Sequence, residues 1–209
     1  MNDLRRELIA KACAMQPAGL NKGTSGNLSV RCGDGFLITP TGLPYAALSL
    51  DDIPLMALDG SWQGPRKPSS EWRFHRDLYA IRPEVGAVLH AHSPFAVSLA
   101  CLRREIPPFH YMIARFGGTT IRCADYAIFG SEALSTVALQ AMHERKACLL
   151  ANHGLLVAGR DLDEAFALAV ELEELCEQYW RACQLGAPIL LDAAEMAAVL
   201  EQFKGYGQQ

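Results

Sequence analysis

Apolar residues recur at helical spacing near both ends of the chain. Towards the N-terminus they are three or four positions apart, which predicts an amphipathic helix over residues 3–17. These positions are Leu4, Leu8, Ala12 and Met15. A longer repeat begins after Asp161, where Asp161-x-x-Glu164 resembles a capping box, and it predicts the longest helix, ending at Gly186. Its apolar side carries Ala165, Ala169, Leu172, Cys176 and Tyr179.

Short apolar runs between these helices, bounded by glycine, proline and polar residues, predict β-strands. They cover residues 28–31, 36–39, 85–92, 147–150 and 155–157. Asp34-Gly35 predicts a hairpin turn between the first two runs, and Pro94 ends the third run before a helix of small apolar residues. Ser69 and Ser70 are good N-caps for a further helix that runs to about Arg82.

The order of these elements predicts the fold class. No internal repeat, low-complexity segment or flexible linker divides the sequence, so we expect a single domain over residues 1–209. A helix, hairpin-linked strands and further helices together predict an α/β sandwich with much antiparallel pairing.

Composition and charge argue against several classes of protein. Half of the 209 residues are hydrophobic and 20% are charged, as in ordinary globular proteins. The formal net charge is −4 without a run of lysine or arginine, which argues against a general nucleic-acid or acidic-membrane surface. The charged N-terminus is unlike a secretion signal, and the longest uncharged stretch, residues 85–102, contains two histidines and a proline, so we expect a soluble protein. Seven cysteines without a C-x-x-C pair favour a reduced, cytoplasmic protein.

The most informative local pattern is His90-Ala91-His92. Because side chains alternate faces along a strand, residues two apart project from the same side, and two imidazoles can reach one point. The alternative is that His90 and His92 are two polar side chains on a solvent-exposed face of the strand. His153, in a tight turn between two apolar strands, is a third candidate, although a lone histidine there is more typical of a structural role. Three imidazoles without a thiolate would suit Zn²⁺ with one position open for substrate. We expect His75 and His143 to be structural.

Three polar loops are suited to bind an anion, because they offer hydroxyl groups and unhindered backbone N–H groups. They are Thr24–Asn27, Thr41-Gly42 and Ser69-Ser70. The last lies at a predicted helix N-terminus, where the helix dipole favours phosphate. None is a nucleotide-binding motif, and each taken singly is more often an ordinary turn or cap.

Glu71 connects the two sets of residues, because it directly follows the serines in the first turn of a predicted helix. One interpretation is a surface acid that complements the helix dipole, as most glutamates there do. The other is a base beside a metal-bound substrate. Spacing in the sequence does not decide between them.

Taken together, these residues resemble the class II aldolase/adducin family, most closely its bacterial L-fuculose-phosphate aldolases. The matching motifs follow in order along nearly the whole chain, which makes the set specific. They are residues 20–27 (LNKGTSGN), 37–42 (LITPTG), 68–75 (PSSEWRFH), 110–114 (HYMIA), 152–155 (NHGL) and 203–207 (FKGYG). The resemblance implies a three-layer α/β/α sandwich with a largely antiparallel central sheet, a mobile tail from about residue 201, and a homotetramer with sites at subunit interfaces.

The resemblance also implies a set of site residues. One Zn²⁺ per subunit would be held by His90, His92 and His153. Glu71 would be the catalytic acid/base and would also ligate the metal when no substrate is bound. Two tyrosines are implied to be catalytic, namely Tyr111, which reaches the site of a neighbouring subunit, and Tyr206 in the tail. The substrate phosphate would be bound by Gly26, Asn27, Thr41, Gly42, Ser69 and Ser70.

The activity implied is reversible cleavage of a ketose 1-phosphate to dihydroxyacetone phosphate and a small aldehyde such as L-lactaldehyde. The expected substrate is L-fuculose 1-phosphate or a related deoxyketose phosphate. The same family contains pentulose-phosphate 4-epimerases, which use an additional histidine near the C-terminus, whereas the last histidine here is His153. Methylthioribulose-phosphate dehydratases are a second enzymatic alternative. A non-catalytic adducin-like binding domain is disfavoured, because the metal ligands and Glu71 are all present.

Overall fold

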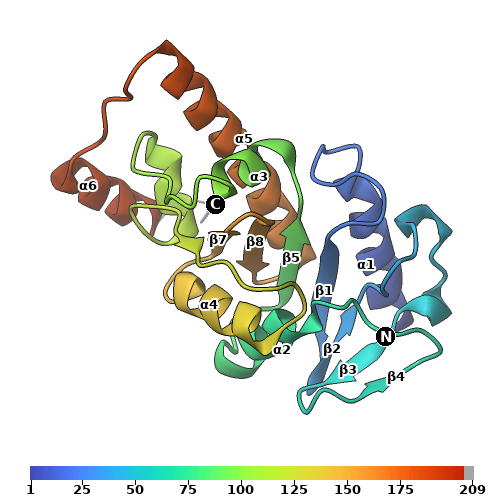
Figure 1. The fold of residues 1–209 in the computed structure, drawn as a ribbon. Helices are drawn as coiled ribbons and strands as arrows, with labels where there is room; N and C mark the ends of the chain where they lie inside the picture. Colours follow the sequence, from blue (N-terminus) through green and yellow to red (C-terminus); the bar gives the residue numbers. More distant parts are fainter. Residues whose placement is uncertain (205–209) are drawn as a thin grey trace.

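The computed structural model describes residues 1–204, and its centre is one eight-stranded sheet (Figure 1). The strands are β1 (Asn27–Cys32), β2 (Gly35–Ile38), β3 (Leu55–Ala57), β4 (Trp62–Gln63), β5 (Ala87–Ala91), β6 (Cys123–Ala124), β7 (Ala147–Leu150) and β8 (Gly154–Gly159). Their order in the sheet is β4-β3-β2-β1-β5-β8-β7-β6. Within the described residues, neighbouring strands are antiparallel except for β6 and β7, which are parallel.

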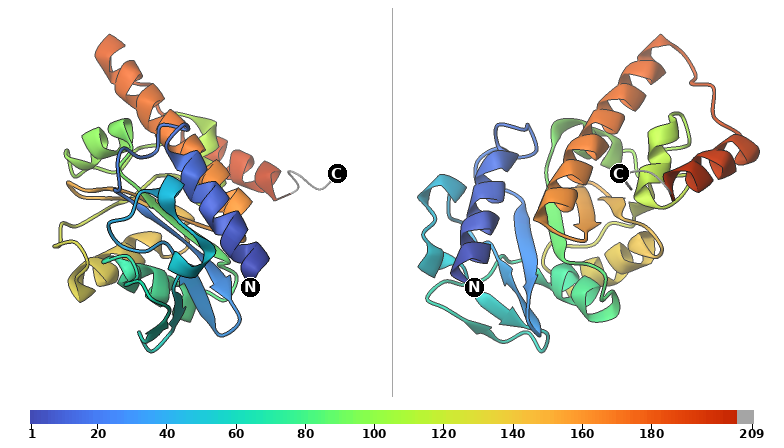
Figure 2. Two further views of the ribbon diagram at one scale, coloured as in Figure 1. Left: turned by 90° about the vertical axis from the view of Figure 1, so that its right-hand side faces the viewer. Right: turned by 180° about the vertical axis from the view of Figure 1, so that it is seen from behind.

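Helices cover both faces of this sheet and give the molecule three layers (Figure 2). One face is covered by α1 (Asn2–Met15), α3 (Pro94–Ala100) and α5 (Leu162–Leu185). The other is covered by α2 (Trp72–Ile81) and α4 (Glu132–Met142). The last helix, α6 (Ala193–Phe203), packs against the 3₁₀ helix η3 (Tyr111–Phe116). Two short 3₁₀ helices, η1 (Tyr45–Ala47) and η2 (Leu50–Asp52), lie between β2 and β3.

The central strands supply both hydrophobic cores by alternation of their side chains. In β5, Ala87 and Leu89 pack in the core beneath α1, α3 and α5, whereas Val88 packs in the core beneath α2 and α4. In β8, Leu155 and Leu156 divide between the two cores in the same way. The predicted three-layer α/β/α sandwich with a largely antiparallel sheet is confirmed.

Two predicted helix caps differ from the structure. The serines do not cap α2, so that prediction is wrong. Glu71 is the N-cap residue, and Ser69 Oγ accepts a hydrogen bond from the Glu71 N–H at 3.3 Å. The capping box of α5 is half formed, because the Asp161 side chain accepts from the Glu164 N–H, whereas the Glu164 carboxylate accepts from the Arg160 N–H.

The last helix continues past residue 201, where the mobile tail was predicted to begin. Helix α6 continues to Phe203, so the first residues of the predicted mobile tail are helical. Residues 205–209, with the candidate Tyr206, lie outside the described residues. Among residues 1–204, no helix combines the length and apolar character that crossing a membrane requires.

Candidate active site and metal centre

The pairing of β5 with β8 brings the predicted histidines together. His90 lies in β5 and His92 follows it, while His153 lies in the turn between β7 and β8. The ring centroids are 4.8 Å apart for His90 and His92, and 4.7 and 4.9 Å from these rings to that of His153. A Cβ at Gly154 would lie 2.3 Å from the Ala91 carbonyl oxygen, so the turn approaches β5 this closely only as glycine.

Glu71, at the start of α2, lies among these rings. Its Oε1 is 3.2 Å from His153 Nε2, and its Oε2 is 3.3 Å from His90 Nε2. The residue is 7% exposed, which excludes the interpretation as a surface acid. Burial opposes ionisation of the Glu71 carboxyl, but the imidazoles of His90 and His153 outweigh it and lower the pKa.

This donor set fits a divalent metal ion. The ligand atoms of Glu71, His90, His92 and His153 all lie within 4.8 Å of one another. Three of the separations are 2.9, 3.2 and 3.3 Å, close to the edge of about 3.4 Å of a tetrahedron around a metal with 2.0–2.1 Å bonds.

The protonation of two of the rings also suits a metal. His90 Nδ1 is 2.8 Å from the Leu155 carbonyl oxygen, which only accepts hydrogen bonds. Nδ1 therefore carries a proton, and Nε2 is the ring nitrogen that faces the site and can ligate a metal. Burial, together with the neighbouring His90 and His153, lowers the pKa of His92 to about 4, so this ring is neutral and able to ligate near pH 7.

Two side chains from distant parts of the sequence hold the segment that carries His92. Asn21 Oδ1 accepts a hydrogen bond from the His92 N–H at 3.0 Å. Glu173 of α5 accepts from the Ser93 hydroxyl at 2.6 Å and from two backbone N–H groups in the first turn of α3 at 2.8 and 2.9 Å. Sequence analysis missed both contacts, because neither side chain differs in pattern from an ordinary loop or helix residue.

A cavity of about 340 Å³ adjoins the four side chains, and its lining includes Glu71, His92 and His153. All six residues predicted to bind phosphate line the same cavity. They are Gly26, Asn27, Thr41, Gly42, Ser69 and Ser70. Gly26 has a φ of +78°, and a Cβ there would lie 2.4 Å from the Asn21 amide nitrogen, so this loop requires glycine.

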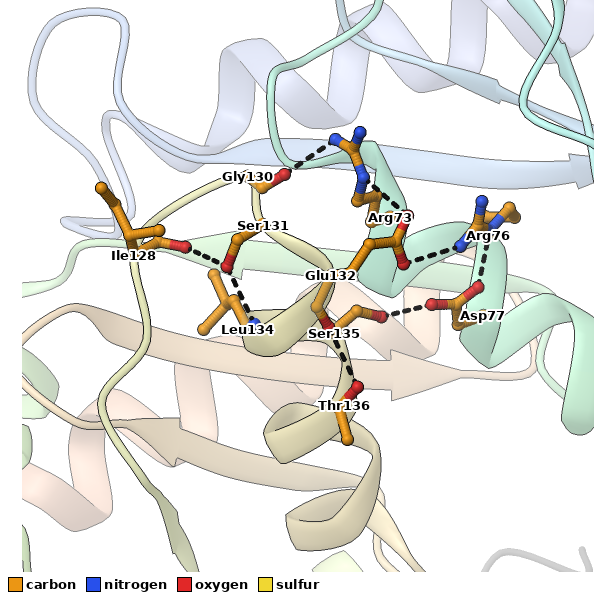
Figure 3. A network of polar contacts seen from close by, with 10 residues as sticks. All are labelled: Arg73, Arg76, Asp77, Ile128, Gly130, Ser131, Glu132, Leu134, Ser135 and Thr136. Carbon is orange, nitrogen blue, oxygen red and sulfur yellow. Dashed lines mark hydrogen bonds and ion pairs between the residues drawn. The ribbon is translucent and has the colours of Figure 1, made fainter.

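The segment between β6 and α4 adds an apolar part to the cavity lining, which sequence analysis missed. Its lining residues are Tyr126, Ala127 and Phe129. Figure 3 shows the polar network that ties the end of this segment to α2. Arg73 donates to the Gly130 carbonyl oxygen at 2.7 Å and to Glu132 at 2.9 Å, and Ser135 donates to Asp77 at 2.5 Å. The network therefore connects the apolar lining to the helix that follows Glu71.

The remaining candidates lie elsewhere. Tyr111 begins η3, is 51% exposed, and lies outside the lining described for the cavity of its own chain. His143 is the C-cap residue of α4 and is exposed. His75 is fully buried in α2.

Comparison with known proteins shows the family to which the chain belongs. The sequence matches the family described as Class II Aldolase and Adducin N-terminal domain over residues 6–180. The chain therefore belongs to the class II aldolase and adducin family. The prediction of a metal-dependent enzyme of the aldehyde-lyase class is confirmed at this level.

Individual relatives extend over almost the whole chain. The 5-methylthioribulose-1-phosphate/5-deoxyribulose-1-phosphate aldolase of Rhodospirillum rubrum is 59% identical over 204 residues, which cover 98% of this chain and 92% of that protein. The L-fuculose phosphate aldolase of Escherichia coli is 44% identical over 207 residues, covering 99% and 96%. A solved structure of L-fuculose 1-phosphate aldolase superimposes with a TM-score of 0.94 at 39% identity, covering 98% of this chain and 97% of the other.

Proposed function

We propose that this protein is a zinc-dependent aldolase that cleaves a 5-deoxypentulose 1-phosphate to dihydroxyacetone phosphate and a small aldehyde. The observation that carries this proposal is the convergence of Glu71 and three histidines beside a cavity lined by hydroxyl-rich and glycine-rich loops. The 59% identity to an aldolase named for 5-methylthioribulose 1-phosphate and 5-deoxyribulose 1-phosphate supports these substrates over L-fuculose 1-phosphate, whose named aldolase is 44% identical.

The cavity lining supports a substrate with one anionic and one apolar end. The three polar loops offer hydroxyl groups and backbone N–H groups for the phosphate. The aldehyde end would contact Tyr126 and Phe129. An apolar surface favours a methyl or methylthio group, which gains from leaving water, over a hydroxyl group, which gains nothing from this contact.

His90, His92 and His153 would hold the Zn²⁺, and Glu71 would complete the ligand set when no substrate is bound. Three imidazole nitrogens and one carboxylate oxygen are a donor set that suits zinc. When bound, zinc supplies Lewis-acid stabilisation of the negative charge that develops beside the reacting carbon.

Glu71 is the proposed general acid/base. In the condensation direction its carboxylate takes a proton from the hydroxymethyl carbon of dihydroxyacetone phosphate, and in cleavage it returns that proton. The buried Oε1 lies 3.2 Å from His153 Nε2 and has no other polar partner among the described residues, so it is the oxygen proposed for this transfer. The polar loops contribute by holding the phosphate, and therefore the reacting carbon, in place.

Tyr111 is the proposed acid for the aldehyde oxygen during condensation, and it takes the same proton back during cleavage. Its exposure, and its place outside the lining of its own cavity, support a homotetramer in which a neighbouring subunit contributes this hydroxyl. Tyr206 is a further proposed catalytic residue, on the family resemblance alone.

A panel of ketose 1-phosphates tests the proposal, with enzymatic detection of dihydroxyacetone phosphate. We expect kcat/KM to be highest for 5-deoxyribulose 1-phosphate and 5-methylthioribulose 1-phosphate and lower for L-fuculose 1-phosphate. A chelator should abolish the activity and added zinc should restore it. An isomeric sugar phosphate as product would indicate an epimerase, and loss of water from the substrate would indicate a dehydratase. Either result would contradict the proposal.

A further inference from the structure

A line of buried polar side chains joins β1 to α2 behind the site. Asn27 and Ser29 are two residues apart on β1 and therefore face the same way. Glu71, His75 and Tyr79 are four residues apart and form one stripe along α2 and its N-cap. All five residues are 7% exposed or less, so water does not replace their contacts.

Four contacts connect these side chains in order. Asn27 Nδ2 lies 3.0 Å from Glu71 Oε2, and Asn27 Oδ1 lies 2.5 Å from His75 Nε2. On the other side of the ring, His75 Nδ1 lies 2.7 Å from Ser29 Oγ, which in turn lies 2.8 Å from the Tyr79 hydroxyl oxygen. The line therefore runs without a gap from Tyr79 to the carboxylate.

The direction of every hydrogen bond follows from the carboxylate. An ionised carboxylate only accepts, so the amide nitrogen of Asn27 faces Glu71 and the amide oxygen faces His75. His75 Nε2 therefore donates. Burial lowers the pKa of His75 to about 3, so the ring is neutral and its Nδ1 accepts from Ser29. Ser29 has one proton to give and accepts from Tyr79, whose hydroxyl keeps its proton because burial raises its pKa.

The carboxylate and the donor at His75 Nε2 together hold the Asn27 amide in one orientation. The orientation that presents the amide N–H groups to Glu71 and the amide oxygen to His75 satisfies both neighbours. Without the His75 donor, the buried Oδ1 would lose its partner and the amide would be held at its Glu71 end alone. The correct orientation holds Glu71 Oε2, while Oε1 accepts no hydrogen bond from the described residues and lies 3.2 Å from His153 Nε2.

We propose that His75 is a positioning residue, which donates to Asn27 Oδ1 and through this amide aims the Glu71 carboxylate at the reacting proton. The proposal rests on the proposed function in taking Glu71 as the acid/base. It assigns a task to a histidine that does not line the cavity. It also gives the Asn27 side chain a task apart from any contact with the substrate phosphate.

Two substitutions of His75 test this role. His75→Leu removes the donor and should lower kcat about 10- to 100-fold, while KM changes by no more than about twofold. His75→Gln keeps an amide donor towards Asn27 and should recover most of the lost kcat. Tyr79→Phe is the matched control, because it removes a hydroxyl from the same buried stripe at the far end of the line, and its kcat should stay near that of the wild type. Thermal unfolding verifies that each variant is folded.

Several results would overturn the role of His75. They are an unchanged kcat in His75→Leu, an equal loss in the leucine and glutamine variants, or an equal loss in Tyr79→Phe. The ¹⁵N NMR shifts of the imidazole give a test without any variant activity, because wild-type His75 should be protonated at Nε2 and bare at Nδ1, with or without zinc. Protonation at Nδ1 would overturn the proposal.

The failure of this inference is distinguishable from failure of the proposed function. If Glu71→Gln abolishes proton exchange on dihydroxyacetone phosphate while His75→Leu keeps full activity, only the positioning role fails. If Glu71→Gln exchanges protons at the wild-type rate, the proposed function fails as well.

Discussion

The Glu173 carboxylate of α5 accepts hydrogen bonds from the N-terminus of α3, close to His92. Replacing Glu173 with alanine measures how much these hydrogen bonds contribute to the free energy of unfolding. The carboxylate accepts three hydrogen bonds of 2.6–2.9 Å, one from Ser93 and two from backbone N–H groups. Hydrogen bonds to a charged group contribute about 1.5–3 kcal/mol each, and loss of a helix N-cap costs about 1 kcal/mol. Water can reach this half-buried position and replace part of these contacts, so we expect Glu173→Ala to lower the free energy of unfolding by about 3 kcal/mol.

Thermal unfolding of the metal-free protein measures this loss. For a domain of this size, about 3 kcal/mol corresponds to a fall in Tm of about 6–12 °C. Glu174→Ala is the matched control, because this neighbouring carboxylate is exposed and, among residues 1–204, accepts a hydrogen bond only from the Gln178 side chain, at 3.0 Å. It should change stability by no more than about 0.5 kcal/mol.

Zinc binding gives a second readout of the same change. Because Ser93, the N-cap residue of α3, directly follows His92, Glu173→Ala should also weaken zinc binding about tenfold in a competition assay with a chelator. A Tm within about 2 °C of the wild type would refute the reasoning, as would equal losses in Glu173→Ala and Glu174→Ala.

Three further substitutions test the proposed chemistry. His92→Ala should lose the metal, and stoichiometric zinc in the purified variant would contradict its place as a ligand. Glu71→Gln should keep zinc but lose about 10²- to 10⁴-fold in proton exchange between dihydroxyacetone phosphate and solvent, measured by NMR; wild-type exchange would remove Glu71 from this role. Tyr111→Phe should slow cleavage more than proton exchange, whereas an equal loss of both would indicate a structural tyrosine. If subunits share sites as proposed, mixing the Tyr111→Phe and Glu71→Gln proteins should restore activity, because some sites would then combine an intact Glu71 with an intact Tyr111.

Strong periodicities made much of the fold predictable from the sequence. The apolar repeats of α1 and α5 and the runs of β1, β5, β7 and β8 are all present in the structure. These elements are long or buried on one or both faces, so their patterns are clear. Strands β3, β4 and β6 have only two or three residues each, and α4 and α6 lie in segments for which no element was predicted. The three short strands depend on pairing with their neighbours in the sheet and carry no periodicity of their own.

Part of the candidate site could also be predicted from the sequence, and part could not. The spacing of His90 and His92 indicated that their rings share one side of a strand, and the structure has that arrangement. The approach of His153 depends on the pairing of β5 with β8, which the sequence does not encode locally. The same limit hides Glu173, because its contact with Ser93 spans 80 positions along the chain.

The link from Glu71 to His75 shows why the rest of the site escaped prediction. The four-residue spacing of glutamate, histidine and tyrosine along this helix can be read from the sequence. Which side chains they contact depends on the strand that packs against the helix. The structure pairs this stripe with the polar residues of β1, and only then does a buried histidine expected to be structural acquire a defined partner. Donor and acceptor directions are properties of such a pairing rather than of either element alone.

X-ray diffraction at the zinc absorption edge, from crystals of protein purified without chelator, tests the central claim most directly. We predict one anomalous peak per subunit, within about 2.0–2.1 Å of a nitrogen from each of His90, His92 and His153. Refinement that places His153 away from the other two rings, or a zinc-soaked crystal without a peak between them, would contradict the metal centre and the chemistry proposed for it.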